Sequence, residues 1–261
     1  MTPLLAQLED LAQRAGRIAL SFYGRVAAER KQDLTLVSRA DREVEAFLRR
    51  ELGRLAPDVP FIGEESAADP EVVGRARAAE RVWVVDPIDG TTAYLGQLDT
   101  FCVCVAELRG GRPHLGVVHL PALDQTYLAE RGGGALWRNP RGDVALDGTR
   151  PPAKVACLLC PSNVHRDYRV SFEGKVRSLG STALHYALVA RGLGLGAFAR
   201  SHVWDWAAAA AVLEEAGGVM RRLDGRDVDW RELLDGRREE VPVLGAWPDG
   251  WDELARQVAL R

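Results

Sequence analysis

The stretch Trp83-Val84-Val85-Asp86-Pro87-Ile88-Asp89-Gly90-Thr91-Thr92 leads an apolar run directly into two carboxylates. The bulky and β-branched residues predict a buried strand, and Pro87 and Gly90 predict a turn that aims both acids at one point past the strand end. Hard cations such as Mg²⁺ prefer carboxylate oxygens, and one acid shared by two ions about 3.5–4 Å apart suits displacement at phosphorus. The alternative is a turn in which Asp89 caps the next helix.

Two further segments place acids directly after apolar residues. Phe61-Ile62-Gly63-Glu64-Glu65-Ser66 ends a short strand in two glutamates, and Val203-Trp204-Asp205-Trp206 leads into an alanine-rich helix. Glu64 and Asp205 are therefore candidates to join the two aspartates at one site. Taken singly, each has an ordinary explanation, because glutamate pairs are usually solvated and an aspartate at a helix start is often an N-cap.

Upstream, the segment from Lys31 to Asp41 combines a lysine with acids. Ser38 and Asp41 also have the spacing of a capping box. From the residues alone we interpret this segment as the start of a helix.

Apolar periodicity predicts an antiparallel-leaning sheet with helices in the first half and alternating helices and strands in the second. Helices are predicted at residues 4–19, from about 38 to before 57, and at 181–191, 206–216 and 251–260. Strands are predicted at residues 61–62, 82–85, 102–106, 115–120, 125–129, 197–198, 219–220 and 241–244.

The pattern loosens from Gly132-Gly133-Gly134 onward, which places the best boundary between two halves at about residues 135–150. We therefore expect an N-terminal α+β half at residues 1–140 and a C-terminal α/β half at residues 141–261. The first half would carry most of the candidate ligands. The second would carry Asp205 and, by the family resemblance described below, the segment that selects the substrate.

The composition is that of a folded globular protein: 261 residues, 47% hydrophobic and 27% charged. The net charge of −3 gives no general attraction to nucleic acid or anionic membranes, so we expect neither as a partner. An anionic substrate must then be met locally, for example by a bound cation. Glu9 and Asp10 stand where a secretory signal has its apolar core, and no apolar run of eighteen residues follows. We therefore expect a cytoplasmic location.

Four cysteines occur as Cys102-x-Cys104 and Cys157-x-x-Cys160. The second spacing also occurs in zinc and redox sites. Cys102 and Cys104 alternate as buried strand residues do, and no set of four Cys and His ligands is evident. We interpret both pairs as packing residues.

Together and in this order, these segments resemble the inositol monophosphatase family, within the wider fructose-bisphosphatase-like superfamily. The resemblance rests on Gly63-Glu64-Glu65-Ser66, on residues 86–92, and on Trp204-Asp205-x-Ala207 followed by Glu215-Ala216-Gly217-Gly218. It covers nearly the whole chain. It implies a layered αβαβα sandwich, Mg²⁺-assisted hydrolysis of a small phosphorylated metabolite, and a homodimer, as in many relatives.

The resemblance implies two or three Mg²⁺ ions and assigns their ligands. Glu64, Asp86 and the Ile88 carbonyl would hold one ion. Asp86, Asp89 and Asp205 would hold a second, so that Asp86 is shared. Glu64 would also touch a third.

The resemblance also implies catalytic and substrate-binding residues. Thr91, with Asp41, would orient the attacking water, and Glu64 would take part in catalysis. Gly90 and Thr91 would offer backbone donors to phosphate at a helix start, which the positive end of a helix dipole favours independently. Further substrate-binding residues are implied at Lys31, Thr92, Gly180, Ser181 and Thr182.

The residues before Trp204 depart from the inositol-specific pattern. Inositol phosphatases usually carry a glutamate there that receives sugar hydroxyls, whereas residues 197–203 of this chain contain no carboxylate. Arg200 in that segment suits a second anionic group better than a neutral polyol. This favours the related nucleotidases of 3′-phosphoadenosine 5′-phosphate. Thr92 favours inositol phosphatases, because those nucleotidases typically have lysine at its place.

Two further hypotheses stay open at this point. Histidinol-phosphate phosphatases belong to the same family. A non-catalytic relative that binds metal or phosphate is a hypothesis of a different class, and the retained acids with Thr91 argue against it because a pure scaffold has no chemical need for them.

Overall fold

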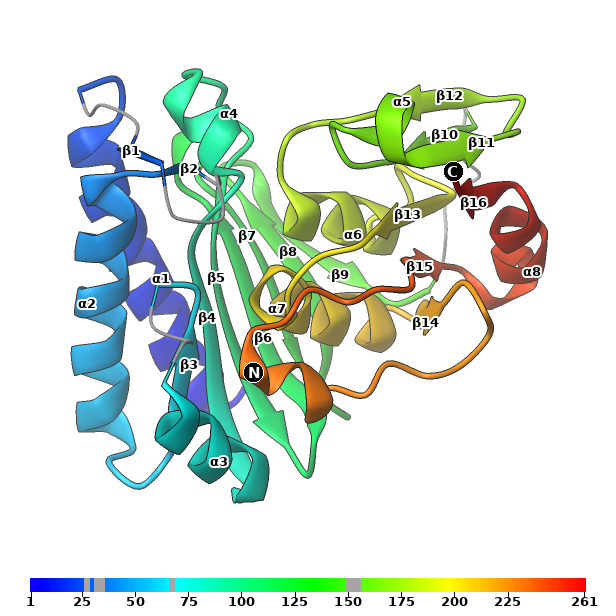
Figure 1. The fold of residues 1–261 in the computed structure, drawn as a ribbon. Helices are drawn as coiled ribbons and strands as arrows, with labels where there is room; N and C mark the ends of the chain where they lie inside the picture. The colour runs from blue at the N-terminus through cyan, green and yellow to red at the C-terminus, as the bar shows by residue number, and fades with distance from the viewer. Residues whose placement is uncertain (26–28, 31–35, 66–68, 149–155) are drawn as a thin grey trace.

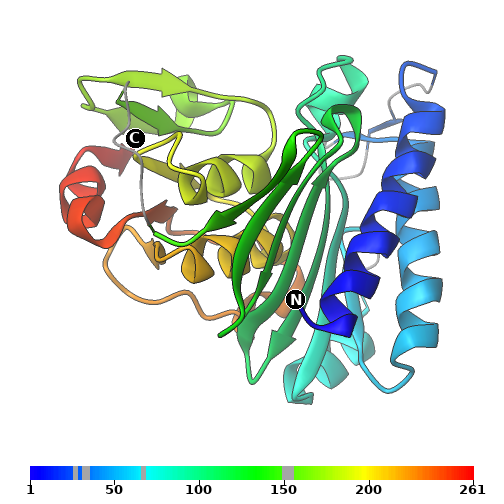
Figure 2. The same ribbon diagram turned by 180° about the vertical axis from the view of Figure 1, so that it is seen from behind.

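The chain folds into five layers that alternate helix and sheet, as Figures 1 and 2 show from opposite sides. This order confirms the predicted αβαβα sandwich. The computed structural model describes residues 1–25, 29–30, 36–65, 69–148 and 156–261. Lys31 lies outside these residues, so its predicted role stays a prediction.

The outer layer consists of two long helices, α1 (Pro3–Phe22) and α2 (Arg39–Leu55). α2 begins with the predicted capping box, in which the N–H and the hydroxyl of Ser38 both donate to the Asp41 carboxylate, at 2.8 and 2.6 Å. Each helix buries one apolar stripe, and the two stripes pack against the same face of the large sheet.

The large sheet has seven strands in chain order, the first pair parallel and the others antiparallel. They are β3 (Phe61–Gly63), β4 (Arg81–Asp89), β5 (Cys102–Arg109), β6 (Arg112–Leu120), β7 (Gln125–Glu130), β8 (Gly134–Asn139) and β9 (Gly142–Leu146). Along β4, Trp83 and Val85 pack against α1 and α2, whereas Val82 and Val84 face the middle layer. Position along β4 therefore decides which layer each of its acids faces.

The middle layer consists of α6 (Thr182–Ala190) and α7 (Val203–Glu215). Both are apolar on nearly all sides, because a sheet covers each of two opposite sides. α7 approaches the large sheet closely: a Cβ on Gly116 of β6 would lie 2.2 Å from the Ala208 carbonyl oxygen. Glycine and alanine at this contact therefore allow α7 to lie close against the large sheet.

The smaller sheet has five strands in the order β12-β10-β13-β15-β14. They are β10 (Cys157–Leu159), β12 (Lys175–Arg177), β13 (Gly196–Ala199), β14 (Val219–Arg222) and β15 (Val243–Ala246). The last layer is α8 (Pro248–Arg256), whose Trp251 and Leu254 pack on this sheet in a cluster with Phe198 and Leu244.

Short elements connect the layers. They are β1 (Glu29–Arg30), β2 (Leu36–Val37), α3 (Pro70–Ala78), α4 (Thr91–Leu95), α5 (Val164–Asp167), β11 (Tyr168–Val170), β16 (Val258–Leu260) and 3₁₀ turns at Pro121–Leu123 and Glu232–Asp235. α4 is tied to α1 by the Tyr94 hydroxyl, which donates to the Ala19 carbonyl at 2.7 Å. Among the described residues, no helix combines the length and apolarity needed to cross a bilayer.

The structure differs from the sequence prediction in several places. β8 and β9 occupy the region predicted to be loose, so the large sheet continues to Leu146. Helix α3 was not predicted. The predicted final helix is wrong beyond Arg256, because residues 258–260 form β16 and pair with β11. Strands β8, β9 and β16 are short and partly exposed, so they lack the alternation of apolar residues by which a strand is recognised.

Candidate active site

Asp86 and Asp89 face the middle layer because β4 contains a β-bulge. Asp86 lies opposite Cys104 and Asp89 opposite Cys102, so one extra residue of β4 is accommodated between the two pairs. In a regular strand, residues three apart point to opposite faces. The bulge turns Asp89 back to the face of Asp86, where the two are 4% and 1% exposed. The prediction of a turn here was wrong, since the strand continues through Asp89.

Asp205 meets these two aspartates from the first turn of α7. Each of the three side chains offers one carboxylate oxygen, and these oxygens lie within 4.8 Å of one another. The Asp205 side chain is 14% exposed. A buried cluster of oxygen donors matches the preference of Mg²⁺ and other hard cations.

Glu64 approaches the cluster from the neighbouring strand. Gly63 of β3 lies opposite Val85 of β4, and the Glu64 N–H donates to the Val85 carbonyl at 3.3 Å. Asp86 is the residue that follows Val85 in β4. Burial raises the pKa of Asp86, and the negative charge of Glu64 raises it further. The structure therefore gathers three of the four predicted side-chain ligands within 4.8 Å of one another, and Glu64 lies close enough to affect Asp86 but outside that group.

The cluster concentrates negative charge away from solvent. Burial first, then the charges of neighbouring acids, raise the pKa of Asp86 well above its usual value. Burial and the charge of Asp205 raise the pKa of Asp89 to about 7. In the described part of the chain, the only basic group in ion-pairing range of the three aspartates is His202, whose Nδ1 is 3.7 Å from Asp205. A divalent cation would remove this repulsion.

Asp89 is held by the start of α6. The Ser181 hydroxyl and the Ala183 N–H donate to its Oδ2, and the Thr182 N–H donates to its Oδ1 at 3.0 Å. These bonds favour the ionised carboxylate and oppose the effect of burial on its pKa. They also fix the position of Asp89 relative to the middle layer.

Asp205 is held by the start of its own helix. Its carboxylate accepts the His202 N–H at 2.8 Å and the Ser201 hydroxyl. Burial alone would raise its pKa, but hydrogen bonds and charge from His202, with Ser201, hold the pKa below its usual value. The sequence left a capping role and a site role as alternatives for Asp205. In the structure the capping contact and membership of the cluster coexist.

Thr91 lies between two oxygen atoms beside the cluster. Its Oγ1 is 3.4 Å from Oδ1 of Asp41 and 3.3 Å from the Ile88 carbonyl oxygen. The Ile88 N–H in turn donates to Asp86 at 3.0 Å. The predicted catalytic pair of Thr91 and Asp41 is therefore in contact, next to the Ile88 carbonyl that was predicted to bind metal.

Two glycine turns meet next to Thr91. Gly90 (φ +94°) and Gly180 (φ +91°) adopt left-handed conformations, and a Cβ on Gly90 would lie 2.9 Å from the Gly180 carbonyl oxygen. This contact gathers the predicted substrate-binding residues of both turns, namely Gly90, Thr91, Thr92, Gly180, Ser181 and Thr182. Ser181 is fully buried, and its hydroxyl serves Asp89 and the Leu184 N–H instead of facing solvent.

Arg200 is half-buried and follows β13. Its backbone N–H donates to the Tyr168 hydroxyl at 3.1 Å, and its carbonyl accepts the Arg238 Nε at 2.9 Å. Its own Nε is buried and makes no hydrogen bond within the described part of the chain. The predicted contact of Arg200 with substrate stays a prediction.

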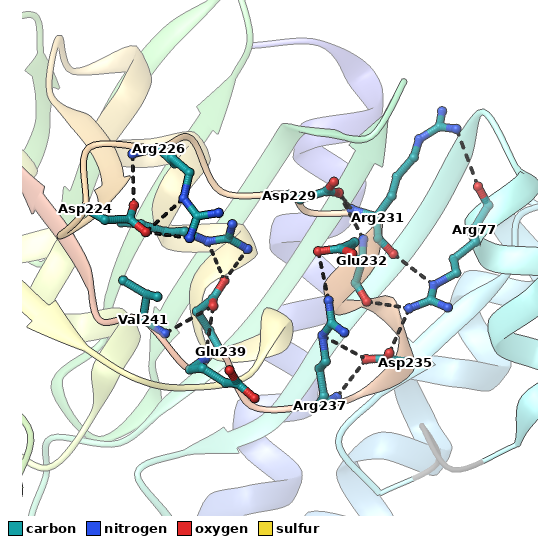
Figure 3. Close-up of polar contacts among 12 residues, drawn as sticks. Arg77, Asp224, Arg226, Asp229, Arg231, Glu232, Asp235, Arg237, Glu239 and Val241 are labelled. Carbon is teal, nitrogen blue, oxygen red and sulfur yellow. Dashed lines mark hydrogen bonds and ion pairs between the residues drawn. The ribbon is translucent and has the colours of Figure 1, made fainter.

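The segment between β14 and β15, residues 223–242, supports the residues before Asp205. The Glu239 N–H donates to the Ser201 carbonyl at 2.9 Å, and the Glu239 carboxylate pairs with Arg222 at 2.7 Å. The same carboxylate accepts the Val241 N–H at 3.3 Å (Figure 3). Figure 3 also shows how Arg77 of α3 holds the same segment, with bonds to the Arg231 and Glu232 carbonyls and to Asp235.

The cysteines have the packing role that the sequence predicted. All four are free, and Cys102, Cys104 and Cys160 are buried. The sequence did not predict that two of them lie beside the aspartates: Cys102 Sγ is 3.4 Å from the Ser181 hydroxyl that donates to Asp89.

Glu45 is a buried acid beside the site that the sequence pattern did not identify. It is 4% exposed on α2, and its Oε2 accepts the Glu65 N–H at 2.7 Å, directly after Glu64. A signal was present, since Glu45 follows Asp41 by four residues and so shares the buried face of the helix with Val44 and Leu48.

Comparisons with known proteins agree with this geometry. The sequence profile of the inositol monophosphatase family matches residues 1–243. The chain belongs to the inositol monophosphatase family. Membership confirms the resemblance and supports phosphatase activity on small phosphate esters.

Its relatives in the family carry different names. A histidinol-phosphatase of Chlorobaculum parvum is 33% identical over 245 residues, covering 90% of each chain. A 3′(2′),5′-bisphosphate nucleotidase of Aggregatibacter actinomycetemcomitans is 30% identical over 278 residues, covering 97% of each. Among solved structures, an IMPase of Thermotoga maritima is similar with a TM-score of 0.78 and 25% identity, over 98% of this chain and 96% of that one.

Proposed function

We propose that this chain is a magnesium-dependent hydrolase of a small phosphomonoester. The observation that carries the proposal is the cluster of Asp86, Asp89 and Asp205, whose carboxylate oxygens lie within 4.8 Å of one another. Its donors are all oxygen, and its charges repel one another, so the cluster fits a hard divalent cation.

Two or three Mg²⁺ ions would be held by Glu64, Asp86, Asp89, Asp205 and the Ile88 carbonyl oxygen. When bound, such ions neutralise phosphate oxygens and make water easier to deprotonate. The chain's own groups would then orient the reaction. A threonine hydroxyl can accept a hydrogen bond from water while it donates its own proton, and Thr91 has Asp41 at 3.4 Å to receive it.

Phosphate would be bound beside this pair. The backbone N–H groups of Gly90 and Thr91 would donate to its oxygens, with Lys31 as a further cation. Gly180, Thr182 and Thr92 would line the substrate side. Ser181 would act through Asp89, because its hydroxyl donates to that carboxylate.

The substrate class is proposed at two levels. The primary proposal is an inositol-monophosphatase-like monoester. A bisphosphate nucleotide is the second candidate, supported by Arg200 in a segment without carboxylates and by the named nucleotidase relative. Histidinol phosphate is a third, supported by the histidinol-phosphatase relative.

The test is phosphate release by the purified chain from inositol 1-phosphate, 3′-phosphoadenosine 5′-phosphate, histidinol phosphate and fructose 1,6-bisphosphate. We expect release from at least one, lost in EDTA and restored by added Mg²⁺. Release that persists in EDTA contradicts the metal requirement. No release from any of the four, at high protein concentration with Mg²⁺, favours the non-catalytic relative instead.

We further propose a cytoplasmic homodimer built from two halves per chain. The large-sheet half would carry most ligands, and the small-sheet half would carry Asp205 and the substrate-selecting segment. Family resemblance supports the dimer, and sedimentation equilibrium of the purified chain tests it, since a monomer at micromolar concentration contradicts it.

A further inference from the structure

Helix α2 carries two buried acids one turn apart, of which the proposed function uses only one. Asp41 contacts Thr91, whereas no step described above involves Glu45. Both side chains are almost fully buried, at 1% and 4% exposure, which is costly for carboxylates unless they are well bonded.

The Glu45 carboxylate lies against the backbone on both sides of Glu64. Its Oε2 accepts the Glu65 N–H at 2.7 Å. On the other side, a Cβ on Gly63 would lie 2.5 Å from the same oxygen, so this approach is possible because residue 63 is glycine. The contact therefore grips the short turn that carries Glu64.

Within the described part of the chain, the sheet holds this turn through one neighbouring strand. β3 has only three residues and lies at the edge of the large sheet, so it is paired on one side, with β4. The backbone bond nearest to the turn, from the Glu64 N–H to Val85, is long at 3.3 Å. The bond from the Glu65 N–H to Glu45 on α2 is shorter, at 2.7 Å, so helix α2 holds the turn more firmly than the sheet does.

We propose that Glu45 is a positioning residue of the metal centre: by holding residues 63–65, its carboxylate keeps Glu64 directed at Asp86. The inference rests on the proposed function, because it takes Glu64 and Asp86 to share a cation. A purely structural role is the alternative, in which Glu45 stabilises α2 through its ion pair with Arg49, 3.3 Å away.

The experiment is a Mn²⁺ titration of the metal-free protein, followed by electron paramagnetic resonance, with circular dichroism to verify folding. Glu45→Ala removes the acceptor and should weaken binding about tenfold or more. Glu45→Gln keeps an oxygen that can accept the Glu65 N–H, so we expect it to bind within about threefold of wild type. Arg49→Ala is the matched control, since it removes the ion pair, in which the arginine side chain is 43% exposed, and leaves the Glu65 N–H bonded to Glu45. We expect it to change binding by less than about twofold.

Wild-type binding by folded Glu45→Ala overturns the inference, and so does an equal loss in Arg49→Ala or in Glu45→Gln. If Glu45→Ala does not fold, Gly63→Ala takes its place, because its methyl group must displace the Glu45 oxygen. It should also weaken Mn²⁺ binding about tenfold, and unchanged binding in this variant overturns the inference. If the wild-type protein binds no Mn²⁺, the proposed metal centre itself is wrong.

Discussion

The carboxylate cluster and residues 197–203, called the Arg200 segment below, are adjacent but are held in place in different ways. Asp86 and Asp89 lie on an inner strand of the large sheet, and Asp89 is bonded to three donors at the start of α6. Arg200 is held through backbone contacts to Tyr168 and to Arg238, and Arg238 is exposed. The geometry of the carboxylate cluster therefore depends on the core, whereas Arg200, which we propose to contact the substrate, also depends on an exposed segment. The named relatives, whose names give different substrates, are compatible with this division.

Asp86→Asn removes one carboxylate of the buried cluster and should have the largest effect of the substitutions. It removes charge and coordination from the ligand proposed to be shared by two ions, so we expect kcat to fall about a thousandfold or more. Circular dichroism should be nearly unchanged, because an amide fits the same space. Near-normal turnover at ordinary Mg²⁺ concentration would sink the assignment of the site.

Arg222→Ala breaks the support of the Arg200 segment. The Arg222 and Glu239 side chains are 12% and 7% exposed, so the change leaves a buried carboxylate without its cation. We expect urea unfolding to show a loss of about 3 kcal/mol in the free energy of unfolding. Arg226→Ala is the control, because its pair with Asp224 is solvated, with Arg226 67% exposed, and it should cost less than about 1 kcal/mol. Equal losses in the two variants contradict the account of this segment.

Arg200→Ala tests whether Arg200 contacts the substrate. If Arg200 meets a second anionic group, its loss removes a charge-assisted contact of about 1.5–3 kcal/mol. The ratio of kcat/KM for a bisphosphorylated substrate to that for a monophosphate should then fall about tenfold to a hundredfold. The ratio is the informative quantity, since damage to folding or metal binding lowers both values together. An unchanged ratio removes Arg200 from the site.

His185→Gln probes the turn between the two regions and should have the smallest effect. His185 Nε2 accepts the Leu179 N–H at 2.9 Å, and burial lowers the pKa of His185 to about 4. Because folding lowers the pKa of His185, the contribution of this neutral side chain to the free energy of unfolding is complete above the unfolded pKa of about 6.5. The contribution is lost as the pH falls toward 4.

Between pH 7 and 5, wild type should therefore lose about 2 kcal/mol more free energy of unfolding than His185→Gln. His119, whose pKa burial also lowers to about 4, contributes equally to both proteins and cancels in the difference. Urea unfolding at several pH values measures the difference. Parallel pH dependence in the two proteins contradicts a buried, neutral His185.

The sequence predicted the elements whose signals are local. The apolar run before Asp86 and the spacing of Ser38 and Asp41 both identify their own structure, a strand and a helix start. The strand β9 has no such signal, because four of its five residues are exposed. Its place in the sheet depends on pairing with β8, which the sequence pattern does not show.

The candidate site residues can be proposed from their chemical type and their order along the chain. Their arrangement in space cannot, because it depends on contacts between distant segments. The bulge that turns Asp89 toward Asp86 depends on pairing with Cys102 and Cys104 of β5. The sequence also treated capping and ligation as rival roles for Asp205. The structure shows that one carboxylate can cap α7 and still lie in the cluster, since each of its oxygens can accept more than one contact.

The most direct test of the central claim is the location of bound metal in crystals of this chain grown with Mn²⁺, from anomalous scattering. We predict an anomalous peak in contact with the carboxylates of Asp86, Asp89 and Asp205, and no such peak in crystals of Asp86→Asn. Peaks only at other positions, or the same peak in Asp86→Asn, would contradict it.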